Sequence, residues 1–158
     1  MAQRINDARN TLKFSADEVT LAVDMLEAVE KTIEMVYFLM ERDNIETFVL
    51  MLMSAENTDL KSILDKEKRD TDILFEVDKE KTTYVMLCQD TKVDGGYRFA
   101  ERIIGTISAS NGTEIYCSQL EVRSTRHPVK TVLFKVLESF LKAKRESKSS
   151  EIIYKSLN

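Results

Sequence analysis

Residues 48–53 have the sequence Phe-Val-Leu-Met-Leu-Met, a run of apolar side chains with no polar residue among them. A strand with one face in solvent alternates apolar and polar residues, whereas a strand covered on both faces is apolar throughout. The run is too short to cross a bilayer, because a spanning helix needs about 20 apolar residues. We therefore expect residues 48–53 to form the central strand of a sheet with helices on both faces.

Amphipathic helices are expected before and after this strand. Upstream, Ser15 and Glu18 have the spacing of a capping box, and apolar residues at helical intervals continue to Met40, which predicts a helix of about 25 residues. Downstream, a short polar helix is expected at about 58–66 and an amphipathic helix from about 94. A last long helix is expected after Pro128, because proline is tolerated in the first turn of a helix.

Four further strands are expected from short apolar runs. Residues 73–77 and 83–88 flank a charged turn and predict a β-hairpin, residues 115–122 predict another strand, and residues 151–155 predict a final edge strand. The order of these elements predicts an α+β domain in which helices pack on a mixed, mainly antiparallel sheet. We expect residues 15–158 to form this domain and residues 1–14 to be a linker or an N-terminal extension.

The composition excludes several classes of function. A chain of 158 residues is expected to form one domain. It has four glycines and neither the G-x-G-x-x-G nor the G-x-x-x-x-G-K-[ST] pattern, which excludes Rossmann and P-loop nucleotide sites. The net charge of −4, from 23 basic and 27 acidic residues, argues against nucleic-acid binding, which requires an excess of Lys and Arg.

The cysteines and the first residues indicate a reducing compartment. Cys88 and Cys117 are too far apart for a C-x-x-C motif, and the one histidine does not complete a zinc site with them. Residues 1–13 are polar and charged, without the apolar segment of a signal peptide. We expect buried thiols, no membrane span and a cytoplasmic location.

Five short segments, taken in order, resemble segments of one known family. They are Asp17-Glu18-Val19-Thr20, Arg69-Asp70-Thr71-Asp72-Ile73-Leu74, Tyr84-Val85-Met86-Leu87, Phe99-Ala100-Glu101-Arg102-Ile103 and Leu141-Lys142-Ala143-Lys144. Together they resemble the GGDEF family, the bacterial diguanylate cyclases that make cyclic di-GMP from two GTP. The resemblance spans about residues 17–154. It implies a GGDEF/nucleotide-cyclase-like fold, a central mixed sheet flanked by helices, with a shortened first helical segment.

The chain departs from the family where the family binds metal. Family members hold two metal ions with carboxylates at the end of the central strand and in the signature hairpin, as hard cations require oxygen ligands. This chain has Ser54-Ala55-Glu56 at the first place and Glu80-Lys81-Thr82-Thr83-Tyr84 at the second. The stretch from Glu56 to Arg69 is also too short for the family's base-recognition helix and loop. We therefore expect a degenerate GGDEF domain with no catalytic residues, no metal and no cofactor.

The R-x-x-D segment is the inhibitory, product-binding site of active family members. The resemblance implies that Arg69, Asp72, Arg98 and Arg102 bind cyclic di-GMP. An arginine engages a guanine edge or a phosphate through two parallel hydrogen bonds, and the aspartate would accept hydrogen bonds from guanine N–H groups. The alternative remains open that Arg69 and Asp72 are ordinary polar residues at the start of a strand.

Two functions follow. The first is an inactive regulatory domain in signal transduction that is a receptor for cyclic di-GMP. The second is a protein-protein interaction module that kept the GGDEF fold without a ligand, with the long N-terminal helix pairing in a homodimer. Six methionines are expected mainly in the core, although exposed ones would suit a partner surface: Met25, Met35, Met40, Met51, Met53 and Met86.

Overall fold

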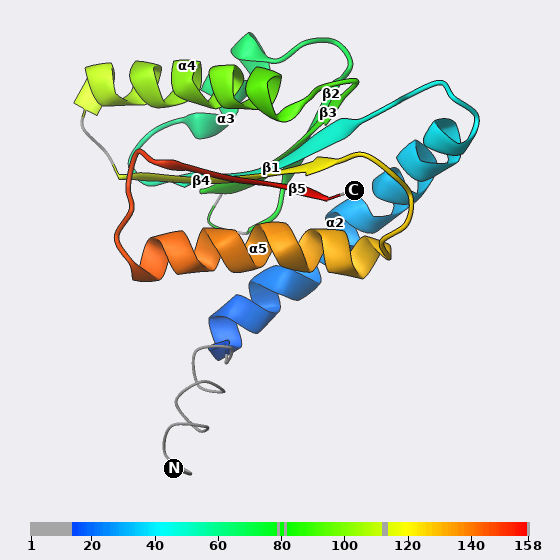
Figure 1. Ribbon diagram of the computed structural model, residues 1–158. Coiled ribbons are helices and arrows are strands. Elements are labelled where there is room, and N and C mark those ends of the chain that lie inside the picture. The colour runs from blue at the N-terminus through cyan, green and yellow to red at the C-terminus, as the bar shows by residue number, and fades with distance from the viewer. Residues whose placement is uncertain (1–13, 79, 81, 112–113, 158) are drawn as a thin grey trace.

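The computed structural model describes residues 14–78, 80, 82–111 and 114–157, and it forms one five-stranded sheet between two layers of helices (Figure 1). Helices α3 and α4 cover one face of the sheet, and α2 and α5 cover the other. The elements are α2 (Ala16–Glu41), β1 (Phe48–Ala55), α3 (Leu60–Glu67), β2 (Asp72–Glu76), β3 (Thr83–Gln89), α4 (Val93–Asn111), β4 (Ile115–Val122), α5 (Val129–Arg145) and β5 (Ile152–Leu157). Residues 1–13 of the expected linker or extension, Lys79 and Lys81 of the expected charged turn, and Asn158 of the expected domain lie outside the described residues.

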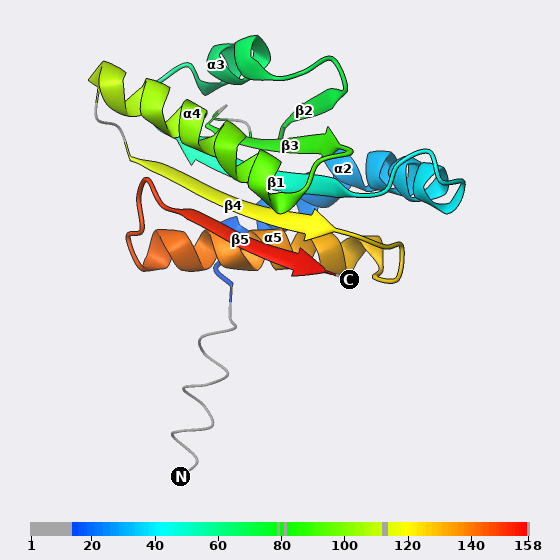
Figure 2. The same ribbon diagram turned by 45° about the horizontal axis from the view of Figure 1, so that its top comes forward.

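The sheet has the strand order β2-β3-β1-β4-β5, so that β1 is its central strand. Strand β1 pairs antiparallel with β3 and β4, β2 pairs antiparallel with β3, and β5 lies parallel to β4. Figure 2 shows β5 at one edge of the sheet, beside β4. All eight residues of β1 are buried. The expected fold class, a mixed and mainly antiparallel sheet with a doubly covered central strand, is confirmed.

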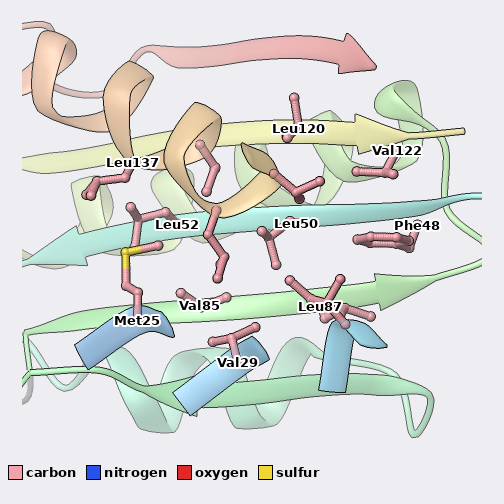
Figure 3. Close-up of a cluster of buried hydrophobic side chains, with 14 of the residues drawn as sticks. Met25, Val29, Phe48, Leu50, Leu52, Val85, Leu87, Leu120, Val122 and Leu137 are labelled. Carbon is pink, nitrogen blue, oxygen red and sulfur yellow. The ribbon is translucent and has the colours of Figure 1, made fainter. Parts of the chain in front are cut away.

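Alternate residues of β1 enter two separate cores. Phe48, Leu50 and Leu52 pack toward α2 and α5, among the side chains that Figure 3 shows. Val49 and Met51, one residue out of phase, pack toward α3 and α4. Because successive side chains of a strand point to opposite faces, one uninterrupted apolar run supplies both cores.

Helix α2 begins with the expected capping box. The Ser15 hydroxyl accepts a hydrogen bond from the Glu18 backbone nitrogen, and the Ser15 nitrogen donates one to the Glu18 carboxylate. The prediction that Met35 lies in the core is wrong, because its side chain is 59% exposed. The buried residues of α2 recur every three or four positions, and Met35 falls between two of them, Ile33 and Val36. No helix in the described part of the chain is long and apolar enough to span a membrane.

Candidate functional site

The four residues predicted to bind a ligand line one pocket. Arg69 precedes the turn into β2 and Asp72 is the first residue of that strand. Arg98 and Arg102 come from successive turns of α4. The pocket has a volume of about 260 Å³. Its remaining lining residues come from the end of β3, from the β3–α4 loop and from α4: Cys88, Thr91, Gly95, Gly96 and Phe99. The fold thus brings together two segments that are separate in the sequence.

Asp72 and Arg69 form a close ion pair at the base of this site. Arg69 Nη2 lies 2.8 Å from Asp72 Oδ1, and Nε donates to both carboxylate oxygens, at 3.2 and 3.4 Å. The backbone nitrogen of Arg69 donates to Asp72 Oδ2 at 2.8 Å. The Asp72 side chain is only 3% exposed, whereas that of Arg69 is 53% exposed. The buried carboxylate therefore holds the guanidinium in place.

Arg69 also ties the turn before β2 to the end of β3. Its Nη2 donates to the carbonyl oxygen of Gln89 at 2.9 Å and to Thr91 Oγ1 at 2.6 Å. The hydrogen bonds from Arg69 to Asp72 raise the pKa of the guanidinium, so it stays charged. Among the described residues, Nη1 makes no hydrogen bond, and it is the part of the fork that remains available to a ligand.

The two arginines of α4 are largely unengaged. Within the described part of the chain, Arg98 makes one long ionic contact, 3.7 Å, with Asp94 one turn earlier, and the side chain is 73% exposed. The guanidinium carbon of Arg102 lies 5.3 Å from the centre of the Phe99 ring, within the range of a cation–π contact. Both guanidinium groups can therefore turn toward an anion or an acceptor edge at little cost.

Glu121, which sequence reasoning missed, positions α4. This residue of β4 is 1% exposed, and its Oε2 accepts a hydrogen bond from the backbone nitrogen of Val93, the first residue of α4. Its Oε1 accepts hydrogen bonds from Arg123 Nε and from the Ser156 hydroxyl. Burial raises the pKa of Glu121, but these hydrogen bonds outweigh it and hold the pKa below the usual value. An acidic residue between Leu120 and Val122 in a buried strand was the available signal.

A glycine lets α4 lie close to the sheet. A Cβ atom on Gly96 would lie 3.0 Å from Gln119 Oε1 and 3.1 Å from Val49 Cγ1. The carbonyl oxygen of Gly96 accepts a hydrogen bond from Gln119 Nε2 at 2.7 Å. This close approach sets the depth at which the turn bearing Arg98 meets the pocket.

The end of β1 has a different character. Ser54 is buried, Ala55 ends the strand, and Glu56 is exposed. Asp59 accepts hydrogen bonds from the nitrogen and hydroxyl of Ser62 at 3.2 and 2.7 Å, so it caps α3. Within the described ranges, no group of three or more His, Cys, Asp or Glu residues is arranged to hold a metal ion.

A larger hollow of about 930 Å³ lies between the α2–β1 loop and the end of β4. Its charged lining residues have both signs, with Lys92 and Arg123 beside Glu41, Asp43 and Glu46. This mixture favours no particular ligand charge. The smaller pocket, with its three arginines, is the better candidate site.

No protein-family model matches the sequence, and no curated protein is similar to it in sequence. Among solved structures, the GGDEF domain of DgcB from Caulobacter crescentus in complex with c-di-GMP is similar with a TM-score of 0.68 at 8% identity, over 79% of this chain and 86% of that chain. A structure of the coiled coil and GGDEF domain of DgcB has a TM-score of 0.69 at 8% identity, over 80% and 78% of the two chains.

The diguanylate cyclase SiaD of Pseudomonas aeruginosa, solved in complex with its activator SiaC, is similar with a TM-score of 0.59 at 15% identity. That similarity covers 98% of this chain and 70% of SiaD. At such low identities, these similarities establish the fold alone.

Proposed function

On a fold that is GGDEF-like, we propose that this chain acts in the cytoplasm as a catalytically inactive regulatory domain that binds cyclic di-GMP. The observation that carries the proposal is the convergence of Arg69, Arg98 and Arg102 on one pocket. The DgcB structures that share the fold contain c-di-GMP, and this makes the same ligand the first to test here.

The charge of the pocket suits a ligand that carries phosphates. The lining has three guanidinium groups and one carboxylate, and that carboxylate is buried against Arg69. A local excess of positive charge within a chain of net charge −4 favours an anion at this place. The volume is below the roughly 300–1,000 Å³ of pockets that enclose a drug-sized molecule. The pocket would hold one base or phosphate, with the rest of the ligand over α4.

Titration calorimetry with cyclic di-GMP tests the proposal. Arg98→Ala and Arg102→Ala are the informative variants, because both residues are exposed. The fold does not depend on the one long ionic contact of Arg98. Each substitution should weaken binding about tenfold, the worth of one hydrogen bond to a charged group. Arg126→Ala removes an exposed arginine from the β4–α5 loop, outside the pocket, and should leave the affinity unchanged. Failure of the wild-type protein to bind, or an equal loss in all three variants, would exclude the proposed site.

A second function, a protein-protein interaction or dimerisation module, is favoured by a separate observation. Val19, Val23 and Phe134 on α2 and α5 are each more than 40% exposed. An apolar hollow of about 210 Å³ lies between the same two helices. Light scattering over a range of concentrations would detect a dimer, and Val23→Asp should dissociate a dimer that uses this surface. A constant monomer mass would exclude the homodimer.

A further inference from the structure

The carboxylate of Asp72 is turned toward Arg69. Three donors of one residue, the backbone nitrogen, Nε and Nη2 of Arg69, already donate to its two oxygens. The side chain is 3% exposed. For Asp72 to accept hydrogen bonds from a guanine, it would have to give up its partner and leave Arg69 without its buried counter-charge. Removing the counter-charge from a buried carboxylate is costly, although the Arg69 side of this pair is half exposed.

The other polar side chains of the lining are weaker acceptors than a carboxylate. Thr91 Oγ1 accepts from Arg69 Nη2 at 2.6 Å and donates to the carbonyl oxygen of Gln89 at 3.0 Å. Cys88 has a thiol whose pKa burial raises to about 12, so it is protonated and at best a weak acceptor. The remaining side chains with polar atoms among the lining residues are arginines, which only donate.

The donors, by contrast, are available and charged. Nη1 of Arg69 makes no hydrogen bond to the described residues, Arg98 makes one long ionic contact, and Arg102 lies over the Phe99 ring. A guanine presents the acceptors O6 and N7 on one edge and the donors N1–H and N2–H₂ on another. Guanidinium groups match the first edge and the phosphate oxygens. They do not match the second.

We propose that this pocket recognises only the acceptor groups of its ligand, namely O6 and N7 of a purine and the phosphate oxygens, and does not recognise the 2-amino group. The inference rests on the proposed binding of cyclic di-GMP and defines its specificity. A ligand whose bases are hypoxanthine keeps O6, N7 and N1–H and lacks only the 2-amino group. Such a ligand should bind as tightly as cyclic di-GMP.

Calorimetry of the full chain with three ligands tests this inference. Cyclic di-IMP should bind with a dissociation constant within about threefold of that of cyclic di-GMP. Cyclic di-AMP should bind at least about tenfold more weakly, because its 6-amino donor would face the arginine donors. Equal affinity for all three ligands would overturn the recognition of O6 and leave phosphate binding alone.

Other outcomes separate this inference from the proposed function. Binding of cyclic di-GMP at least about tenfold tighter than cyclic di-IMP would overturn the inference while the proposed function stands. Binding of neither ligand would overturn the proposed function, and the inference with it. Asp72→Asn supplies an internal comparison, because it should lower the affinity for cyclic di-GMP and for cyclic di-IMP by the same factor. A preference for cyclic di-GMP that is present in the wild type and lost in this variant would show that the carboxylate contacts the 2-amino group.

Discussion

The carboxylate of Glu121 accepts a hydrogen bond from the backbone nitrogen of Val93 at 2.7 Å, so that a side chain on β4 caps the first turn of α4. The N-terminus of a helix has unpaired N–H groups and a partial positive charge, and both favour a carboxylate. The same carboxylate accepts from Ser156 on β5 and from Arg123. One buried acidic group therefore joins three elements, and α4 carries two of the three arginines of the pocket.

Glu121→Gln should destabilise the protein. The amide keeps the size of the side chain but loses the charge that faces Arg123 and the end of α4. The expected loss is about 1–3 kcal/mol in the free energy of unfolding, as for a weakened hydrogen bond to a buried charged group. Denaturant unfolding at pH 7 measures it. Glu101→Gln, on the exposed side of α4, is the matched control and should change stability by less than about 0.5 kcal/mol.

The advantage of the wild type over Glu121→Gln should depend on pH. The pKa of Glu121 in the folded protein lies below its ordinary value of 4.5. A carboxyl group with a lowered pKa stabilises the fold above the unfolded-state pKa, and the contribution is lost as the pH falls through the folded-state pKa. The difference in unfolding free energy should be constant above about pH 5 and shrink below 4.5. A difference that grew on acidification would contradict this assignment.

Arg69→Ala should destabilise the fold as well as remove a binding group. It leaves the buried Asp72 carboxylate without its counter-charge, with the backbone nitrogen of residue 69 and the Cys88 thiol as remaining donors in the described site. It also removes the hydrogen bonds that Arg69 donates to Gln89 and Thr91. The expected cost is about 1–3 kcal/mol, seen as a lower denaturation midpoint. Adding Asp72→Ala to Arg69→Ala should recover part of the loss, because the unpaired carboxylate is removed. A double variant whose loss is the sum of the two single losses would contradict the coupling.

Binding of cyclic di-GMP should weaken as salt increases. The proposed contacts join exposed guanidinium groups to phosphates, and exposed charges are screened at an ionic strength of about 0.1 M and above. Calorimetry at low and high sodium chloride concentration should give a clear rise in the dissociation constant. Arg98→Ala should reduce the steepness of that rise. Affinity that does not depend on salt would show that the arginines do not meet the ligand's charge.

No cyclic di-GMP should form when the protein is incubated with GTP and Mg²⁺ or Mn²⁺. Metal-assisted phosphoryl transfer needs carboxylates at fixed places, and the end of β1 has Ser54 and Ala55 instead. Chromatography of the nucleotides after a long incubation is the measurement. A cyclic product that appeared with the purified wild-type protein would refute the proposed inactivity.

The two cysteines should resist modification in the folded protein. Cys88 and Cys117 are buried and not in a disulfide, and burial raises the pKa of both thiols, that of Cys88 to about 12. The thiolate is the reactive form, so a thiol reagent at pH 8 should label neither residue within minutes. Both should react after unfolding in guanidinium. Rapid labelling of the folded protein would mean that the sheet opens locally.

Local patterns predicted most of the elements, because they depend on residues near one another in the chain. The capping box at Ser15 and the apolar run of β1 each give a signal within a few positions. Met35 shows the limit, since an apolar residue type does not by itself say which helix face it occupies. The strand order was not predictable from periodicity, because Leu50 pairs with Leu87 and with Leu120, both far away in the sequence.

The sequence predicted which four residues would lie near one another, but it did not predict the contacts that they make. The resemblance and the four-residue spacing of Arg98 and Arg102 selected positions that the fold places around one pocket. The burial of Asp72 against Arg69 depends on the packing of β2 beside β3, where Asp72 lies opposite Cys88. Glu121 was missed for the same reason, because its partners Val93 and Ser156 come from elements that only the tertiary fold places beside it.

The central position of β1 also has a consequence during synthesis. Its two hydrogen-bonding partners, β3 and β4, both follow it in the chain. At 5–20 residues per second, translation reaches the end of β4 roughly 3–13 s after the end of β1. Throughout that interval, at least one edge of the most apolar segment of the nascent chain has no native partner. Unpaired apolar strands tend to associate with one another, so we expect the yield of folded protein to depend on chaperone capacity and on translation speed between residues 55 and 122.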